Sequence, residues 1–252
     1  MFHCLEKTTE IMIMKNFQNK NCLIVGASGG IGNQIAKKMS EFDCNLFLVG
    51  KNKNKLTTLK KEIADKNKAI KIEFGTVDLT NDQSINNLIK KIRKEFGTID
   101  ILINTAGLFI VKSLENSSVQ EFDECFRINV RAPFIFCKEF SKDMKKRKWG
   151  RIINIGSSSS YNGFKNGTMY CSTKHSLLGL SRALFVELKE YGIRTYCISP
   201  GSAKTKMGRL SKDQNFETFL NPNEIAEYVA FVISFDKELI SEEVKLNRIK
   251  IE

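Results

Sequence analysis

The sequence predicts an α/β fold, with one doubly wound domain on a parallel sheet of about seven strands and helices on both faces. Short apolar runs alternate along the chain with segments whose apolar residues recur at helical spacing. The runs are apolar throughout, so the strands are expected to be buried on both faces, as in a parallel sheet. No Gly/Ser/Pro-rich linker interrupts the 252 residues, which contain only 3 prolines, and this favours one domain.

The order of elements follows from these patterns. The expected strands are Asn21–Gly26, Asn45–Gly50, Ile70–Phe74, Ile99–Ile103, Arg151–Ile155, Ile193–Ser199 and a final edge strand, Val244–Ile251. The expected helices are Ile31–Phe42, Lys53–Lys66, a helix carrying the stripe Ile85–Ile92, two long helices, Val119–Lys145 and Tyr170–Tyr191, and a late helix, Glu224–Phe235. Right-handed crossovers then place a ligand crevice at the carboxyl ends of the strands.

Composition narrows the classes of protein. The net charge of +12 admits an anionic partner, but the lysines are spread over many segments without a nucleic-acid motif, so we expect no nucleic-acid partner. No apolar stretch approaches 18 residues, so no membrane span is expected. Seven cysteines without metal-type spacing indicate reduced thiols in a cytoplasmic protein and no metal site. Residues 1–15 are expected to be a loosely ordered extension of a domain that covers 16–252.

A glycine-rich turn joins the first strand to the first helix. Gly26, Gly30 and Gly32 form a G-x3-G-x-G pattern that permits a tight turn and close approach of the backbone to a ligand. The helix that follows offers free N–H groups and the positive end of its dipole to phosphates. A glycine-rich turn also serves as a plain connector, but a strand before it and a helix after it favour dinucleotide binding.

The end of the second strand bears on which dinucleotide binds. Sites specific for NAD hold the adenosine ribose with an acidic residue about 20 residues beyond the glycine turn. Here no acid lies between Asp43 and Glu62, and Lys51 follows the strand instead. Lys51 would attract a 2′-phosphate, so NADP(H) is the preferred cofactor, with NAD(H) as the alternative. Lys51 could also be an ordinary surface lysine.

The remaining motifs, taken in order, resemble those of the short-chain dehydrogenase/reductase family from Asn21 to about Phe235, and in particular its 3-oxoacyl-carrier-protein reductases. The resemblance rests on the glycine turn, Asn104-Thr105-Ala106-Gly107 after strand four, Asn129, and Ser157 thirteen residues before Tyr170-x3-Lys174. It implies a Rossmann-like fold and a catalytic group of Asn129, Ser157, Tyr170 and Lys174. It also implies that the cofactor is held by Gly26, Ser28, Gly30, Ile31, Gly32, Asp78, Leu79, Asn104, Ala106, Gly107, Tyr170, Lys174, Pro200, Gly201 and Thr205, besides Lys51.

The residue types explain the implied chemistry. Tyr170 and Lys174 are one helical turn apart and share a helix face. A free tyrosine has a pKa of about 10, and a nearby ammonium is expected to lower it. Tyr170 would then act as the general acid or base, while the Ser157 hydroxyl hydrogen-bonds the same substrate oxygen. By resemblance, Lys174 also holds the nicotinamide ribose and Asn129 anchors a water in a proton relay. Ser158 is the alternative to Ser157 in the serine run 157–160.

The expected activity is NADPH-dependent reduction of a ketone or aldehyde, or the reverse oxidation of an alcohol. The substrate is left open between a 3-oxoacyl thioester and a small or sugar-derived ketone, and it would enter beside a short lid near 206–221. A homo-oligomer, either a dimer or a tetramer, is expected. The alternatives are a non-catalytic cofactor-sensing or scaffold protein that keeps the fold, and a nucleic-acid-binding protein that uses the +12 charge.

Overall fold

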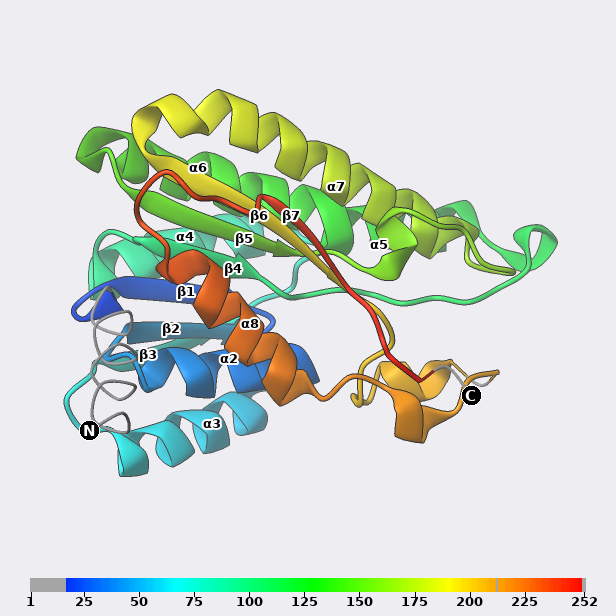
Figure 1. The fold of residues 1–252 in the computed structure, drawn as a ribbon, viewed down its shortest axis with the longest axis horizontal. Coiled ribbons are helices and arrows are strands. Elements are labelled where there is room, and N and C mark those ends of the chain that lie inside the picture. Colours follow the sequence, from blue (N-terminus) through cyan, green and yellow to red (C-terminus); the bar gives the residue numbers. More distant parts are fainter. Residues whose placement is uncertain (1–16, 212, 251–252) are drawn as a thin grey trace, which may run out of the picture.

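The computed structural model describes residues 17–211 and 213–250 and has the predicted doubly wound architecture (Figure 1). Seven parallel strands form one sheet in the order β3-β2-β1-β4-β5-β6-β7. Their bounds are β1 Asn21–Val25, β2 Asn45–Gly50, β3 Ile72–Thr76, β4 Ile101–Asn104, β5 Gly150–Ile155, β6 Ile193–Pro200 and β7 Glu243–Leu246. The predicted extension, residues 1–15, lies outside the described residues.

Helices cover both faces of the sheet (Figure 1). On one face are α2 Gly30–Ser40, α3 Lys53–Lys66 and α8 Pro222–Ser234; on the other are α4 Asp82–Phe96, α6 Ala132–Arg147 and α7 Thr168–Leu188, with α5 Val119–Phe126 leading into α6. Each face has its own apolar core, because successive side chains of a strand point to opposite faces. Ile24 of β1 packs in one core, and its neighbours Leu23 and Val25 pack in the other.

The strand order places a switch point between β1 and β4. From β1 the chain proceeds outward to β2 and β3, and it then returns to β4 on the other side of β1. The loops that follow β1 and β4 therefore diverge and leave a crevice at the carboxyl edge of the sheet. Gly26 and Thr105 stand at the start of these two loops, and the Thr105 hydroxyl donates to the carbonyl of Val25 at 3.0 Å.

The long helix predicted over Val119–Lys145 is wrong in one respect. The structure divides it into α5 and α6 by a π-helical segment, Arg127–Arg131. Asn129 lies in this segment and is fully buried, and its side chain bonds both backbone groups of Leu108. An inserted π-turn is common at functional sites. Helical periodicity gives no sign of it, because the cause is a contact with a distant loop.

The third and the final strand differ most from their predicted bounds. The third strand is Ile72–Thr76 rather than Ile70–Phe74, since its ladder with β2 pairs Leu46 with Ile72 and Gly50 with Thr76. The final strand ends at Leu246 rather than at Ile251, which lies outside the described residues. Beyond Leu246 the chain leaves β6, and Arg248 instead contacts the segment that follows β6.

Arg151 at the start of β5 is a buried cation, only 1% exposed. Its guanidinium stacks over Trp149 at 4.5 Å, donates to the carbonyl oxygens of Gly150, Ile233 and Phe235, and forms an ion pair with Asp236. Burial lowers the pKa of Arg151, and the carboxylate of Asp236 opposes this. The pair ties the end of α8 to the sheet.

We expect Asp236→Ala to lower the free energy of unfolding by about 2 kcal/mol, because it leaves a buried charge without its charged partner. Asp236→Asn keeps an acceptor and should recover part of the loss. As a control, Glu62→Ala removes an exposed ion pair with Lys37 and should cost less than about 0.5 kcal/mol. Denaturant unfolding of the three variants checks this; equal losses for Asp236→Ala and Glu62→Ala would contradict it.

Candidate active site

A cavity of about 640 Å³ opens at the carboxyl edge of the sheet, over the switch point between β1 and β4. The predicted cofactor residues that line it are Gly26, Ser28, Gly30, Ile31, Gly32, Lys51, Asp78, Leu79, Ala106, Gly107 and Thr205. They follow five different strands, yet the fold brings them into one hollow. The cavity extends along the edge of the sheet from the glycine turn to Lys51 on one side and to Gly107 on the other. This elongated shape suits an extended ligand.

The glycine turn leaves no room for side chains. Gly26 has a φ of +100°, and a Cβ there would lie 2.5 Å from the backbone nitrogen of Ala106. A Cβ on Gly32 would lie 2.4 Å from the Gly26 carbonyl oxygen. Gly29, the N-cap of α2, provides no side-chain hydrogen bond, so the first N–H groups of this 11-residue helix face the cavity without an internal cap. The residues present therefore fit a dinucleotide pyrophosphate.

The far end of this cavity carries two cations. Lys51, directly after β2, and Lys55, in the first turn of α3, both line it and are exposed. Asp78 lies opposite, where its carboxylate accepts from the Thr80 hydroxyl at 2.6 Å. Hydrogen bonds from Thr80 hold the pKa of Asp78 below its usual value, and Lys51 adds to this. Lys55 was not predicted from the sequence as a cofactor residue. Its position four residues after Lys51, in the first turn of the following helix, was the available signal.

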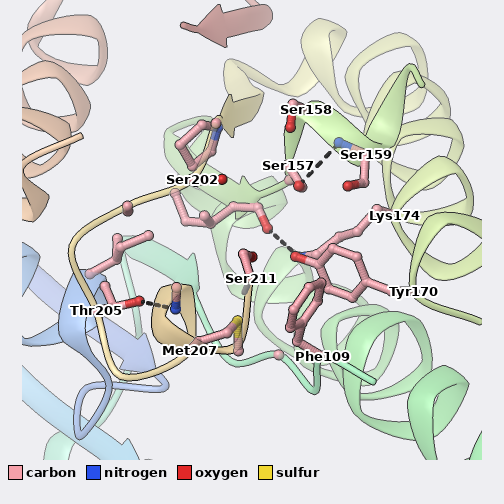
Figure 2. Close-up of a pocket in the computed structure, with 18 of the residues that line it drawn as sticks. Phe109, Ser157, Ser158, Ser159, Tyr170, Lys174, Ser202, Thr205, Met207 and Ser211 are labelled. Atoms are coloured by element: carbon pink, nitrogen blue, oxygen red, sulfur yellow. Dashed lines mark hydrogen bonds between the residues drawn. The ribbon is translucent and has the colours of Figure 1, made fainter. Parts of the chain in front are cut away.

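A second cavity of about 260 Å³ adjoins the first, with Ile31, Thr105, Gly107, Thr205 and Met207 lining both. Ser157, Tyr170 and Lys174 line it from one side (Figure 2). On the other side Ser202, Thr205, Met207 and Ser211 lie on the segment that follows β6 (Figure 2). Pro200 and Gly201 also line this cavity. The structure thus brings the predicted serine, tyrosine and lysine to one wall, next to the dinucleotide-sized cavity.

Ser157 is oriented by its own loop. Its Oγ accepts a hydrogen bond from the backbone N–H of Ser159 at 3.1 Å, so its hydroxyl hydrogen remains available for another acceptor (Figure 2). Ser157 also lies near enough to Tyr170 to act against the rise in the pKa of that phenol. Ser158, the alternative in the serine run, lines the same cavity. The contact with Tyr170 favours Ser157.

Tyr170 and Lys174 are both buried on α7, and burial shifts each pKa toward the neutral form. It raises the pKa of Tyr170 to about 12 and lowers that of Lys174 to about 8. The Lys174 ammonium lies 5.7 Å from the Tyr170 ring centroid and donates to the carbonyl of Ile155 at 2.8 Å. Burial therefore opposes the lowering of the Tyr170 pKa that we expected from Lys174, because desolvation is the largest influence on this phenol.

The free protein should accordingly show no phenolate from Tyr170 up to about pH 10, since a raised pKa keeps the phenol protonated beyond the usual range. The measurement is the phenolate absorbance of the wild type minus that of Tyr170→Phe, followed as pH rises. A titration step near pH 7 in this difference would contradict the prediction and restore a dominant effect of Lys174.

The two asparagines occupy different places. The side chain of Asn129 donates to the Leu108 carbonyl and the Thr173 hydroxyl, each at 2.9 Å, and accepts from the Leu108 N–H at 2.7 Å. Its Oδ1 and the Lys174 ammonium both face Gly107, within 4 Å of where a Cβ would stand. Asn104, also predicted to contact the cofactor, lines neither cavity; its side chain donates to Asn154 inside the sheet.

An aromatic wall completes the smaller cavity. Phe109 contacts the Tyr170 ring edge to face, with centroids 4.7 Å apart, and Phe164 lies 6.1 Å beyond it. Both line the cavity, as does Gln214. These three residues were missed from the sequence. Phe109 follows the Asn104–Gly107 motif by two residues, which was the available signal; Phe164 and Gln214 stand in loops without a pattern.

Comparison with known proteins agrees with this geometry. A family model for short chain dehydrogenase matches residues 20–215. The chain is 32% identical over 237 residues to a 3-oxoacyl-acyl-carrier-protein reductase of Rickettsia bellii, covering 90% of this chain and 95% of that protein. An alcohol dehydrogenase of the archaeon Thermococcus sibiricus, complexed with 5-hydroxy-NADP, superposes with a TM-score of 0.84 at 27% identity, covering 92% and 97% of the two chains. A metagenomic short-chain oxidoreductase in complex with NADP gives 0.81 at 25% identity, with 93% and 99% covered.

Proposed function

The chain belongs to the short-chain dehydrogenase family, and from that premise we propose that it reduces a ketone or aldehyde with NADPH, with Tyr170 as the general acid. The observation that carries the proposal is the joint placement of Ser157, Tyr170 and Lys174 on one wall of a cavity that adjoins the dinucleotide-sized one. As an oxidoreductase of this family, the protein carries out carbonyl chemistry with a nicotinamide cofactor. NADPH as the cofactor and the roles of the residues are our proposals.

The larger cavity would hold the cofactor. Gly26, Gly30 and Gly32 would admit the pyrophosphate, and Lys51 and Lys55 would hold the 2′-phosphate. Lys174, which lines the adjoining smaller cavity, would hold the nicotinamide ribose. When bound, NADPH supplies the hydride that converts the carbonyl carbon to an alcohol carbon. The protein contributes orientation, exclusion of water and a proton.

Tyr170 supplies that proton. Its pKa, raised to about 12, keeps the phenol protonated at neutral pH and so ready to donate to the carbonyl oxygen. Ser157, whose Oγ already accepts from Ser159, donates its hydroxyl to the same oxygen and stabilises the developing charge. A protonated phenol is the form that reduction requires.

The proposed substrate class is supported by fewer observations than the reductase activity. The Rickettsia relative is named for reduction of 3-oxoacyl groups on acyl carrier protein, and a 3-oxoacyl thioester is therefore our first candidate. A small or sugar-derived ketone is the second. The substrate cavity of about 260 Å³, with aromatic side chains beside Tyr170, suits a short carbonyl compound or the end of an acyl chain.

A carbonyl screen tests the proposal. The full chain is mixed with NADPH and a panel of ketones, aldehydes and 3-oxoacyl thioesters, and loss of absorbance in the reduced-nicotinamide band is followed. We expect turnover with at least one class. A thermal shift by NADPH without oxidation across the whole panel would overturn the reductase and favour a cofactor-binding protein without turnover. Salt-sensitive retention on nucleic acid without a thermal shift by NADPH would favour the nucleic-acid-binding protein instead.

A further inference from the structure

The segment after β6 forms a closed loop over the substrate cavity. Its two ends are joined by backbone hydrogen bonds, from the N–H of Lys204 to Leu220 at 2.8 Å and from the N–H of Leu220 to Ser202 at 2.9 Å. We call residues 203–211 and 213–220 the lid segment. Figure 2 shows part of it, from Thr205 to Ser211, facing the wall that carries Tyr170 and Ser157. The side chains that the lid segment turns to the cavity therefore help to select the substrate.

Gln214 of the lid segment lines the cavity with a carboxamide of defined orientation. Its Oε1 accepts two hydrogen bonds, from the Ser202 hydroxyl at 2.8 Å and from the guanidinium of Arg248 at 2.9 Å. Two donors on one atom identify that atom as the oxygen and so fix which way the amide faces. The Nε2 group, with two hydrogens to donate, has no acceptor among residues 17–211 and 213–250.

Arg248 holds this arrangement from the tail that follows β7. Besides Gln214 it donates to the Thr218 hydroxyl at 3.0 Å, and its guanidinium lies 5.0 Å from the ring centroid of Phe219, which is buried. None of the carboxylates in the described part of the chain forms an ion pair with it. Arg248 thus connects three residues of the lid segment to the tail and holds the side chain of Gln214 in its orientation.

We propose that Gln214 is a specificity-determining residue, whose Nε2 donates a hydrogen bond to an acceptor oxygen that the substrate carries besides its reacting carbonyl. Arg248 is its positioning residue. The inference rests on the proposed reductase function and narrows the substrate class to ketones with a second acceptor, as in an ester, a thioester or a carboxylate. Gln214 is exposed, so its Nε2 group bonds water in the absence of a ligand; a ligand with an acceptor replaces this water with a direct hydrogen bond, whereas a ligand without one does not.

The test compares ethyl acetoacetate and acetoacetate, which carry a second acceptor, with heptan-2-one, which does not. The measured quantity is the ratio of kcat/KM for each acceptor-bearing ketone to that for heptan-2-one. Gln214→Glu keeps an oxygen for Ser202 and Arg248 but removes the donor. We expect it to lower the ester ratio about fivefold or more, and the acetoacetate ratio further, through repulsion between carboxylates. A larger decrease in the ratio for acetoacetate than in the ratio for the ester distinguishes a charged carboxylate acceptor from a neutral ester acceptor.

Asn215→Asp is the matched control. It adds the same charge at the next position, keeps the side-chain oxygen that accepts from the Glu217 N–H, and does not line the cavity. We expect both ratios to stay within about twofold of the wild type. If Asn215→Asp lowers the ratios as much as Gln214→Glu, or if Gln214→Glu leaves them unchanged, the assignment of Nε2 as a substrate donor is overturned.

Arg248 is tested through its coupling to Gln214. Arg248→Met should lower the ester ratio, Arg248→Lys should restore part of it, and Arg248→Met combined with Gln214→Leu should lower it no further than Gln214→Leu alone. A purely structural role would lower kcat/KM for all ketones alike and leave the ratio unchanged, which would overturn the positioning role. Turnover of other carbonyls with none of these three ketones would overturn this inference while leaving the reductase in place.

Discussion

Tyr170→Phe is expected to lower the rate of carbonyl reduction about a thousandfold while NADPH still binds. The change removes only the hydroxyl that would deliver the proton and keeps the ring, whose packing against Phe109 with centroids 4.7 Å apart is preserved. Turnover is followed by nicotinamide absorbance, and NADPH binding by thermal shift on the same sample. The split between the two readouts distinguishes a lost acid from a lost cofactor site.

Tyr191→Phe is the matched control, because it removes a tyrosine hydroxyl from an exposed residue that lines none of the cavities described. Its turnover should equal that of the wild type. Undiminished activity of Tyr170→Phe would refute the acid role and leave Ser157 as the group to examine next. Loss of NADPH binding in Tyr170→Phe would instead mean that the hydroxyl of Tyr170 contributes to the cofactor site.

The physical basis of this expectation is the burial of α7. Tyr170 and Lys174 face the same wall, and desolvation moves the pKa of the phenol up and that of the ammonium down. Each shift favours a neutral form, and the neutral phenol is the form that can donate a proton. A positive charge brought beside Tyr170 by a ligand would act in the opposite sense, so the direction of proton transfer depends on which form of the cofactor is bound.

The fold was largely predictable, because its elements obey local rules. α3 begins and ends where the lysine-rich stretch indicated, with Asn52 as its N-cap accepting from the Lys55 N–H at 3.0 Å. The π-turn at Asn129 was not predictable, since its cause is a pair of hydrogen bonds to Leu108, 21 residues earlier in the chain. The end of β7 depends in the same way on Arg248 and its distant partners.

The residues of the site also differ in whether they depend on local spacing or on distant contacts. Ser157, Tyr170 and Lys174 were found because their spacing is a property of the chain, and their meeting at one wall follows from β5 and α7 being adjacent in the fold. Gln214 was not found, because its orientation depends on donors from two other segments. Asn104 stands in a recognisable motif, but its side chain donates to Asn154 inside the sheet, so its predicted contact with the cofactor stays a prediction. The predicted homo-oligomer and cytoplasmic location stay predictions.

Among the described residues no helix is long and apolar enough to cross a membrane. Six of the seven cysteines, at 22, 44, 125, 137, 171 and 197, lie in the described part of the chain; all six are buried and form no disulfide with one another, which agrees with their interpretation as small core residues. Cys171, next to Tyr170, is one of them. His175, the residue after Lys174, hydrogen-bonds the Cys171 carbonyl through its Nδ1 at 2.9 Å. It lines neither of the two adjoining cavities, which agrees with a structural role.

Lys51→Glu is expected to weaken NADPH binding about 100-fold while changing NADH binding less than about threefold. The two cofactors differ only in the 2′-phosphate, and Lys51 stands with Lys55 at the end of the large cavity where we place that group. A charge-assisted hydrogen bond is worth about 1.5–3 kcal/mol, and the new carboxylate adds repulsion, so a change of two decades is reasonable. Equilibrium titration with each cofactor gives the two dissociation constants.

Lys53→Glu is the control for this change. It reverses a charge two residues further along, at the start of α3, but its side chain lies outside the cavity lining, so it tests the effect of net charge alone. Its effect on NADPH should stay within about threefold, because screening weakens an exposed charge beyond one Debye length. Lys55→Glu should resemble Lys51→Glu if both cations face the phosphate. Equal losses of NADPH and NADH in Lys51→Glu would place Lys51 against the part that the two cofactors share, and the preference for NADPH would then need another source.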